Sequence, residues 1–229
     1  PDGFDTTGTR ILSQLDDSLR RLRSDHVDLW QLHVWSDLTP LSETLSALRT
    51  AMDSGRARRV GVCNYSPSQL AQAHRIAADA GITISTVQSE YSLLVRDAEA
   101  LVPELSRTDT GLVAWSPLAG GVLTGKYRDE TPPGSRATDT HYLPYLEPFL
   151  TDSRTVAIVA MLDLIGDALD VSPTQVALAW VRQRPAVTRV LLGARTVEQL
   201  RHSLDGAGLT LPADVHTLLT EATEPESPG

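Results

Sequence analysis

Short apolar segments alternate with longer amphipathic segments along most of this chain. Five apolar segments have the length of strands, at 27–33 (VDLWQLH), 58–63 (RRVGVC), 82–88 (ITISTVQ), 111–115 (GLVAW) and 188–193 (TRVLLG). They are mostly apolar on both faces, and segments with helical periodicity separate them. This alternation predicts a parallel sheet covered by helices. No stretch of linker composition divides the chain, so we expect one domain.

Local signals indicate where the helices begin and end. Helices are expected at 9–23, 39–55, from 66 onward, around 97–107, and at 153–169, 173–184, 196 onward and 211–223. The first has an apolar face made of Ile11, Leu15, Leu19 and Leu22. Thr39 can cap the second helix, Pro40 suits its first position and Gly55 its end. Capping signals open three others, in SPSQ (66–69), SPTQ (172–175) and TVEQ (196–199). Residues 116–150 are expected to form a long loop rich in Gly and Pro.

Composition narrows the class of protein. The formal charge of −9 argues against nucleic acid and anionic membranes as partners. No apolar run approaches the roughly 18 residues of a membrane span, and no signal peptide is visible. Cys63 is the only cysteine, which fits a reducing cytoplasm. Periodicity does not separate an open doubly wound sheet from a (β/α)8 barrel, but no G-x-G-x-x-G follows a strand, which weakens the open-sheet interpretation.

A polar group follows each expected strand. In chain order these groups are His33, Cys63-Asn64, Gln88, Trp115-Ser116 and Gly193-Ala194-Arg195. Ligands gather at the carboxyl ends of strands in either architecture. Each residue also has a plain structural explanation, such as strand-end capping for Asn64 and Gln88 or core packing for Trp115. Five such groups in register predict a lined pocket.

Two segments look suited to anions. GART (193–196) leaves a strand and enters a capped helix, where free backbone N–H groups and Arg195 favour phosphate. The alternative is an ordinary strand-to-helix turn with a solvated arginine. In SPLAGGVLTGKY (116–127), the glycines and Lys126 can cradle phosphates. Lys126 is the only lysine among 20 basic residues.

Five segments in this order, DLWQLH, GVCNYS, VQSEYSLL, AWSPLAGGVLTGKY and GARTVEQL, resemble the aldo-keto reductase superfamily, near bacterial members similar to potassium-channel beta subunits. The resemblance runs from about residue 10 to residue 222. It implies a (β/α)8 TIM-type barrel that binds NADPH without a Gly-rich dinucleotide fold. It also implies reduction of an aldehyde or ketone to an alcohol. No metal is expected, because the other histidines of the chain show no metal-ligand spacing.

The resemblance assigns roles to individual residues. His33 would be the catalytic histidine that orients the substrate carbonyl, and Trp35 a candidate for the substrate wall, although Trp35 can equally be a surface aromatic. The cofactor-binding residues would be Cys63, Asn64, Gln88, Trp115, Ser116, Leu118, Gly120, Lys126, Gly193, Arg195, Gln199 and Ser203. Among them, Asn64 and Gln88 would hold the nicotinamide carboxamide and Trp115 would stack on the ring. Ser203 stands where an asparagine is usual, which puts the adenine contact in doubt.

The family's active site also uses an aspartate, a tyrosine and a lysine that this chain does not match. None of its five tyrosines follows a D-T-A segment. The five strands correspond to the last five of eight, so residues 1–222 would be the carboxyl-terminal portion of a barrel from which about 90 residues are absent. Residues 223–229 would be a disordered tail. We therefore expect strands 27–33 and 188–193 to be open sheet edges, and these 229 residues to be inactive alone. The competing interpretation is a non-catalytic nucleotide-binding barrel that acts as a regulatory or partner-binding subunit.

Overall fold

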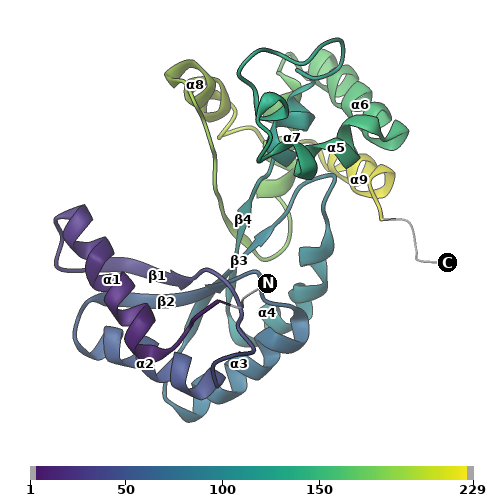
Figure 1. Ribbon diagram of the computed structural model, residues 1–229. Helices are drawn as coiled ribbons and strands as arrows, with labels where there is room; N and C mark the ends of the chain where they lie inside the picture. Colours follow the sequence, from purple (N-terminus) through teal and green to yellow (C-terminus); the bar gives the residue numbers. More distant parts are fainter. Residues whose placement is uncertain (1–3, 226–229) are drawn as a thin grey trace. The chain divides into compact units, whose positions relative to one another are not determined.

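The computed structural model describes residues 4–225 and contains a five-stranded sheet (Figure 1). Its strands are β1 (Val27–Leu32), β2 (Ala57–Cys63), β3 (Ile84–Glu90), β4 (Gly111–Trp115) and β5 (Val187–Val190). Their order is β1-β2-β3-β4-β5, so β1 and β5 are the two ends. β1 pairs with β2, and β2 with β3, in parallel. The predicted α/β fold with a parallel sheet is confirmed, and it is consistent with part of a (β/α)8 barrel.

Helices lie between the strands, as the sequence predicts. They are α1 (Gly8–Leu22), α2 (Leu41–Asp53), α3 (Pro67–Asp79), α4 (Val102–Thr108), α5 (Leu143–Thr151), α6 (Ser153–Leu169), α7 (Pro173–Arg182), α8 (Val197–Asp205) and α9 (Ala213–Ala222). Short 3-10 segments are η1 (Asp97–Leu101), η2 (Ala119–Thr124) and η3 (Arg136–Thr138). Ser66 and Ser172 form complete capping boxes, and Thr196 caps α8. These local signals are therefore confirmed.

Four expectations about local structure are wrong. Thr39 is buried and does not cap α2, whose N-cap is Pro40 without a side-chain bond. Leu22 is 63% exposed and not part of the core face of α1. Residues 116–150 are not one loop, because they contain η2, η3 and α5. β5 ends at Val190 and not at residue 193, so residues 191–195 are irregular and exposed or half-buried.

The end strands are less buried than the apolar pattern suggests. Asp28 and Leu29 of β1 are exposed, as are the two middle residues of β5. In contrast, the last four residues of β2 are all buried. The position of β1 and β5 at the ends of the strand order explains the difference, because an end strand has a neighbour on one side only.

The chain divides into two compact units, which we describe separately. Unit 1 comprises residues 1–89 and 100–113, and unit 2 comprises residues 90–99 and 114–229. The single domain expected from the sequence stays a prediction. The disordered tail expected at 223–229 is wrong at its start, because Thr223 is buried and its hydroxyl donates to the Leu219 carbonyl at 2.7 Å. Residues 226–229 of that expected tail lie outside the described residues.

Unit 1 packs helices against the first strands. Figure 1 shows α1, α2 and α3 around β1 and β2. Leu15 and Leu19 of α1 form a buried cluster with Ala51 and Ala57. The contact between β2 and β3 requires glycine at position 61, because a Cβ there would lie 2.3 Å from Thr86 Oγ1. Each of these contacts depends on the small or apolar side chains that the sequence supplies.

Unit 2 contains a buried ionic network around Trp180. The guanidinium groups of Arg96 and Arg184 both contact the Trp180 ring, at 5.5 and 5.0 Å from its centroid. Both arginines donate to Glu99, and Tyr91 donates to Glu99 Oε1 at 2.7 Å. Arg96 also donates to the carbonyl of residue 220 in α9 at 2.6 Å. A buried charge needs such partners, so we interpret this network as structural.

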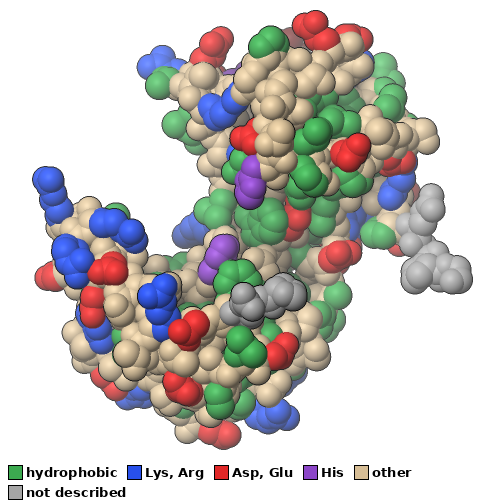
Figure 2. All heavy atoms as spheres, in the orientation of Figure 1, with side chains coloured by type: hydrophobic (Ala, Val, Ile, Leu, Met, Phe, Trp, Pro, Cys, Tyr) green, Lys and Arg blue, Asp and Glu red, His purple; other side chains and the backbone are tan. Residues whose placement is uncertain are grey.

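The surface carries both charge signs. Figure 2 shows acidic and basic side chains interspersed over the α1 region of unit 1. None of the helices in residues 4–225 is long and apolar enough to cross a membrane.

A second polar cluster within unit 1 joins α3, α4 and the residue just before β4. His74 Nδ1 lies 2.7 Å from Glu104 Oε1, and His74 Nε2 lies 3.0 Å from Thr110 Oγ1. Arg107 also donates to Glu104 at 2.6 Å. Burial by itself raises the pKa of the Glu104 carboxyl group, but the hydrogen bonds from His74 and Arg107 outweigh it and hold that pKa below its usual value.

We predict that Glu104→Ala lowers the free energy of unfolding by about 1–3 kcal/mol at pH 7, because the His74 side chain, which is only 10% exposed, loses its carboxylate partner. A carboxyl group whose pKa is lowered by folding contributes stability above its unfolded pKa, and this contribution disappears as the pH falls through the folded pKa. The mutational effect should therefore shrink on acidification. Urea unfolding at a series of pH values measures it, with the exposed Glu130→Ala as control. An effect that stays constant down to strongly acidic pH would contradict the prediction.

Candidate functional site

In unit 1, three of the predicted site residues meet at the carboxyl ends of neighbouring strands. His33 follows β1 directly, Asn64 follows β2 and Gln88 lies near the end of β3. The Asn64 backbone N–H donates to the Gln88 carbonyl at 2.8 Å, and Asn64 Nδ2 donates to the His33 carbonyl at 3.3 Å. Asn64 adopts a left-handed conformation with φ of 58°. The expected grouping of these residues at one edge is confirmed within unit 1; their functional roles stay predictions.

Cys63 and Trp35 flank this group. Cys63 is buried and pairs in register with Gln88, and burial raises the pKa of its thiol to about 11. This agrees with an inert packing residue. The Trp35 ring meets the Tyr65 ring edge-on at 5.1 Å, and its Nε1 donates to Asp37 at 2.7 Å. Trp35 is thus half-buried against Tyr65, which leaves its role at the substrate wall a prediction.

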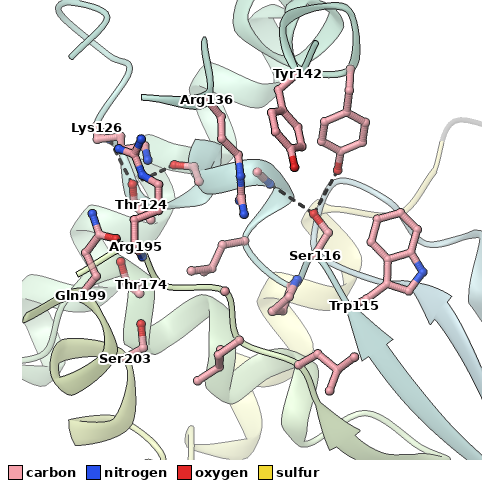
Figure 3. Close-up of a pocket in the computed structure, with 18 of the residues that line it drawn as sticks. Trp115, Ser116, Thr124, Lys126, Arg136, Tyr142, Thr174, Arg195, Gln199 and Ser203 are labelled. Carbon is pink, nitrogen blue, oxygen red and sulfur yellow. Dashed lines mark hydrogen bonds between the residues drawn. The ribbon is translucent and has the colours of Figure 1, made fainter. Parts of the chain in front are cut away.

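Unit 2 contains a pocket of about 840 Å³. The predicted residues that line it are Trp115, Ser116, Leu118, Gly120, Lys126, Gly193, Arg195, Gln199 and Ser203. They come from the end of β4, from the segment after it, from the irregular segment that leads from β5 into α8, and from α8 itself. Figure 3 shows Trp115 at one end of the pocket and Lys126, Arg195, Gln199 and Ser203 grouped at the other. Segments far apart in the sequence therefore form one lined pocket.

The pocket wall is cationic. Lys126, Arg136 and Arg195 line it, and no Asp or Glu is among its lining residues. The Arg136 side chain lies between the Trp115 end and the Lys126 end (Figure 3). Arg195 donates to the carbonyl of Gly134, and its backbone N–H donates to Gln199 Oε1 at 3.0 Å. This arrangement suits an anion with several negative charges.

The glycine-containing segment after β4 is folded into tight turns, and this differs from the expected phosphate cradle. Ser116, Ala119, Gly120 and Gly121 all have positive φ. The N–H groups of Ala119 and Gly121 donate to carbonyls within the segment, and that of Gly120 donates to Ser116 Oγ. Because these amides have internal acceptors, anion contacts in this conformation fall to side chains such as Lys126 and Arg136.

Tyr145 is hydrogen-bonded at the Trp115 end of the pocket. Its hydroxyl donates to Glu90 Oε1 and lies 3.1 Å from Ser116 Oγ. Burial, followed by the hydrogen bond to Glu90, raises the pKa of the Tyr145 hydroxyl. Burial likewise raises the pKa of Glu90, although the bond from Tyr145 opposes the effect. A tyrosine with a raised pKa is a poor proton donor near neutral pH, so Tyr145 is unsuited to act as a general acid.

Sequence reasoning missed several lining residues, namely Thr124, Arg136, His141, Tyr142, Tyr145, Thr174 and His202. Four of them lie in η3, in α5 or in the residues just before α5, within the stretch interpreted as a loop. The apolar and aromatic residues of LPYLEPFL were the available signal for α5, but its two prolines and its short length weaken that signal.

The comparisons agree with this geometry. The Aldo/keto reductase family matches residues 2–224. L-glyceraldehyde 3-phosphate reductase of Escherichia coli K12 is 32% identical over 209 residues, which cover 89% of this chain and 60% of that protein. Uncharacterized oxidoreductase YrpG of Bacillus subtilis is 33% identical over 214 residues, covering 93% and 63%. Protein tas of Escherichia coli K12 is 33% identical over 224 residues, covering 90% and 64%.

The chain thus spans less than two thirds of the length of these relatives. The family match covers nearly all of the chain, and it accords with a parallel sheet whose site residues lie at the strand ends. The chain belongs to the aldo/keto reductase family.

Proposed function

We propose that the full-length protein reduces a small aldehyde or ketone to an alcohol with NADPH. The observation that carries this proposal is the pocket of unit 2, which has an indole ring at one end and three cationic side chains along its wall. A planar aromatic ring favours stacking on a heteroaromatic ring, and arginine forks favour phosphate. NADPH has both features.

The residues present fit that cofactor. Lys126 and Arg136 would face the phosphates, and Arg195 with Gln199 would hold the 2′-phosphate of the adenosine. The charge of the pocket wall supports this assignment, because none of the described residues that line the pocket has a carboxylate to repel an anion. The resemblance assigns Asn64 and Gln88 to the carboxamide and Ser203 to the adenine end, and these assignments stay predictions. When bound, NADPH supplies a hydride to the carbonyl carbon.

His33 is the group of this chain that we place at the reacting carbonyl. It is exposed and follows β1 on the edge where barrel active sites lie. A ring nitrogen there can donate to the carbonyl oxygen and stabilise the charge that develops on it. In the family that this chain resembles, a tyrosine supplies the proton to the carbonyl oxygen. None of the tyrosines of this chain matches that tyrosine. We expect a cytoplasmic location, since the chain has a single buried cysteine.

A non-catalytic nucleotide-binding barrel remains the alternative function. Both proposals require the same pocket, so cofactor affinity does not distinguish them. Turnover does: a regulatory barrel binds NADPH without oxidising it in the presence of carbonyl compounds. Consumption of NADPH by the full-length protein with a panel of small aldehydes and ketones tests the reductase proposal directly.

We predict that Arg195→Ala weakens NADPH binding to the full-length protein by about 1.5–3 kcal/mol and leaves NADH binding nearly unchanged, because a charged hydrogen bond to the 2′-phosphate is lost. Calorimetric titration with both cofactors measures the difference. Arg201→Ala is the matched control, since Arg201 is an exposed arginine of α8 outside the pocket lining. Equal losses for the two cofactors would remove Arg195 from this role.

We predict that His33→Ala lowers turnover of the full-length protein by a factor on the order of 10² or more, with little change in melting temperature. The physical reason is the loss of a donor to the carbonyl oxygen at an exposed position. Steady-state kinetics and thermal unfolding are compared with His26→Ala, because His26 immediately precedes β1 whereas His33 follows it. Normal turnover combined with early melting would indicate a purely structural histidine.

We also expect the 229 residues alone not to reduce carbonyls. Burial raises the pKa of Tyr65 to about 12, and burial with carboxylate hydrogen bonds raises those of Tyr91 and Tyr145. These three tyrosines are thus weaker acids than an ordinary phenol, which disfavours a role as general acid. The assay is NADPH oxidation by the purified chain with the same carbonyl panel. Activity free of any co-purified fragment would refute the expectation.

A further inference from the structure

A chain of four groups crosses unit 2 from the end of β3 to the segment after β4. Tyr145 of α5 donates to Glu90 Oε1, Tyr145 and Ser116 hydroxyl oxygens lie 3.1 Å apart, and Gly120 N–H donates to Ser116 Oγ at 3.2 Å. Tyr145 and Ser116 line the pocket, and Trp115 precedes Ser116 directly. The two contacts of the Tyr145 hydroxyl join it to residues 29 and 55 positions away in the sequence.

The donor and the acceptor in each of these hydrogen bonds follow from the number of hydrogen atoms that the groups carry. A carboxylate only accepts, so the single hydroxyl hydrogen of Tyr145 is given to Glu90. The Tyr145 oxygen can then only accept from Ser116, whose hydrogen is thereby fixed as well. Ser116 Oγ in turn accepts from Gly120. Every hydrogen in the chain has one defined place while Glu90 is ionised.

We propose that Tyr145 is a positioning residue for the cofactor pocket: held by Glu90, its hydroxyl orients Ser116 and so fixes the backbone of residues 115–121. This inference deepens the proposed function, on which its cofactor measurement rests. Ser116 and Ala119 have positive φ, which costs energy for residues with a side chain. A turn of this kind persists only when surrounding contacts hold it.

The other contacts of α5 point to the same role. A Cβ on Gly120 would lie 2.4 Å from Leu146 Cδ2, so α5 packs directly on the turn. The Tyr145 ring meets Phe149 edge-on at 5.6 Å, which keeps the ring in place independently of its hydroxyl. Tyr145→Phe therefore removes the hydrogen bonds and retains the packing.

Glu90 makes the arrangement sensitive to pH. Burial and the charge of Asp97 raise the pKa of Glu90, while the bond from Tyr145 opposes them. Arg136 is the further charged group near Tyr145. A protonated Glu90 can donate a hydrogen bond to the Tyr145 hydroxyl. The directions of the hydrogen bonds between Tyr145 and Ser116 are then no longer fixed. The raised pKa places this loss at a higher pH than for an ordinary glutamate.

The first experiment needs no ligand. Hydrogen exchange followed by mass spectrometry compares the wild-type protein with Tyr145→Phe at a pH above the Glu90 pKa. We expect peptides that contain Gly120 to exchange at least about threefold faster in the variant. The control is Tyr127→Phe, because the buried Tyr127 hydroxyl has no partner among the described residues and Tyr127 does not line the pocket. Unchanged exchange at Gly120 would overturn the proposal.

The second experiment measures NADP⁺ binding by tryptophan fluorescence between pH 5 and 9. We expect the dissociation constant of Tyr145→Phe to exceed that of the wild type by about three- to tenfold at high pH. The ratio should approach one below the Glu90 pKa. Glu90→Gln keeps an acceptor for Tyr145 and cannot ionise, so the effect of adding Tyr145→Phe to Glu90→Gln on the dissociation constant should not vary with pH.

The outcomes distinguish a failure of the proposed function from a failure of the positioning role of Tyr145. A wild-type protein that binds no NADP⁺ refutes the proposed function, and the exchange experiment still decides whether Tyr145 fixes the turn. If the wild-type protein binds NADP⁺ and the dissociation constants of Tyr145→Phe and the wild type are nearly equal at every pH, the positioning role toward the cofactor is refuted. If the dissociation constant of Tyr145→Phe exceeds that of the wild type by the same factor at every pH, the role assigned to ionised Glu90 is refuted.

Discussion

Parallel strand pairing is the constraint on which the candidate site depends. Parallel strands place their carboxyl ends at one edge, and a residue that follows one strand then meets a residue from the next. The backbone bond from Asn64 to Gln88 extends this pairing beyond the end of β2. At the ends of β2 and β4 the chain turns through a non-glycine residue with positive φ, Asn64 and Ser116. The strained residues are thus also the residues that present polar groups.

The pocket shows that local charge can oppose the net charge of a chain. The formal charge is −9, yet the pocket wall carries Lys126, Arg136 and Arg195 without a lining carboxylate. The net charge governs encounters at long range, whereas a concave wall concentrates the potential of the groups that line it. A protein with a negative net charge can in this way repel polyanions and still have a pocket that favours a small phosphorylated molecule.

Much of the fold could be predicted because its signals are local. The capping boxes at Ser66 and Ser172 need only four residues each, and both form as the sequence indicates. The site residues at strand ends followed from the rule that such ends meet. Tyr145 was not predictable in this way, because its place in the pocket depends on how α5 packs on Gly120. Thr39 failed as a cap for a similar reason: tertiary packing buries it.

Lys126 has a practical consequence for anyone who handles this protein. Within these 229 residues, reagents that target primary amines of side chains, including common dyes, cross-linkers and sensor-chip couplings, have one lysine to react with, and it lines the pocket. Immobilisation of these 229 residues through lysine would therefore attach them by the wall of that pocket. Coupling through an added terminal tag leaves that wall untouched.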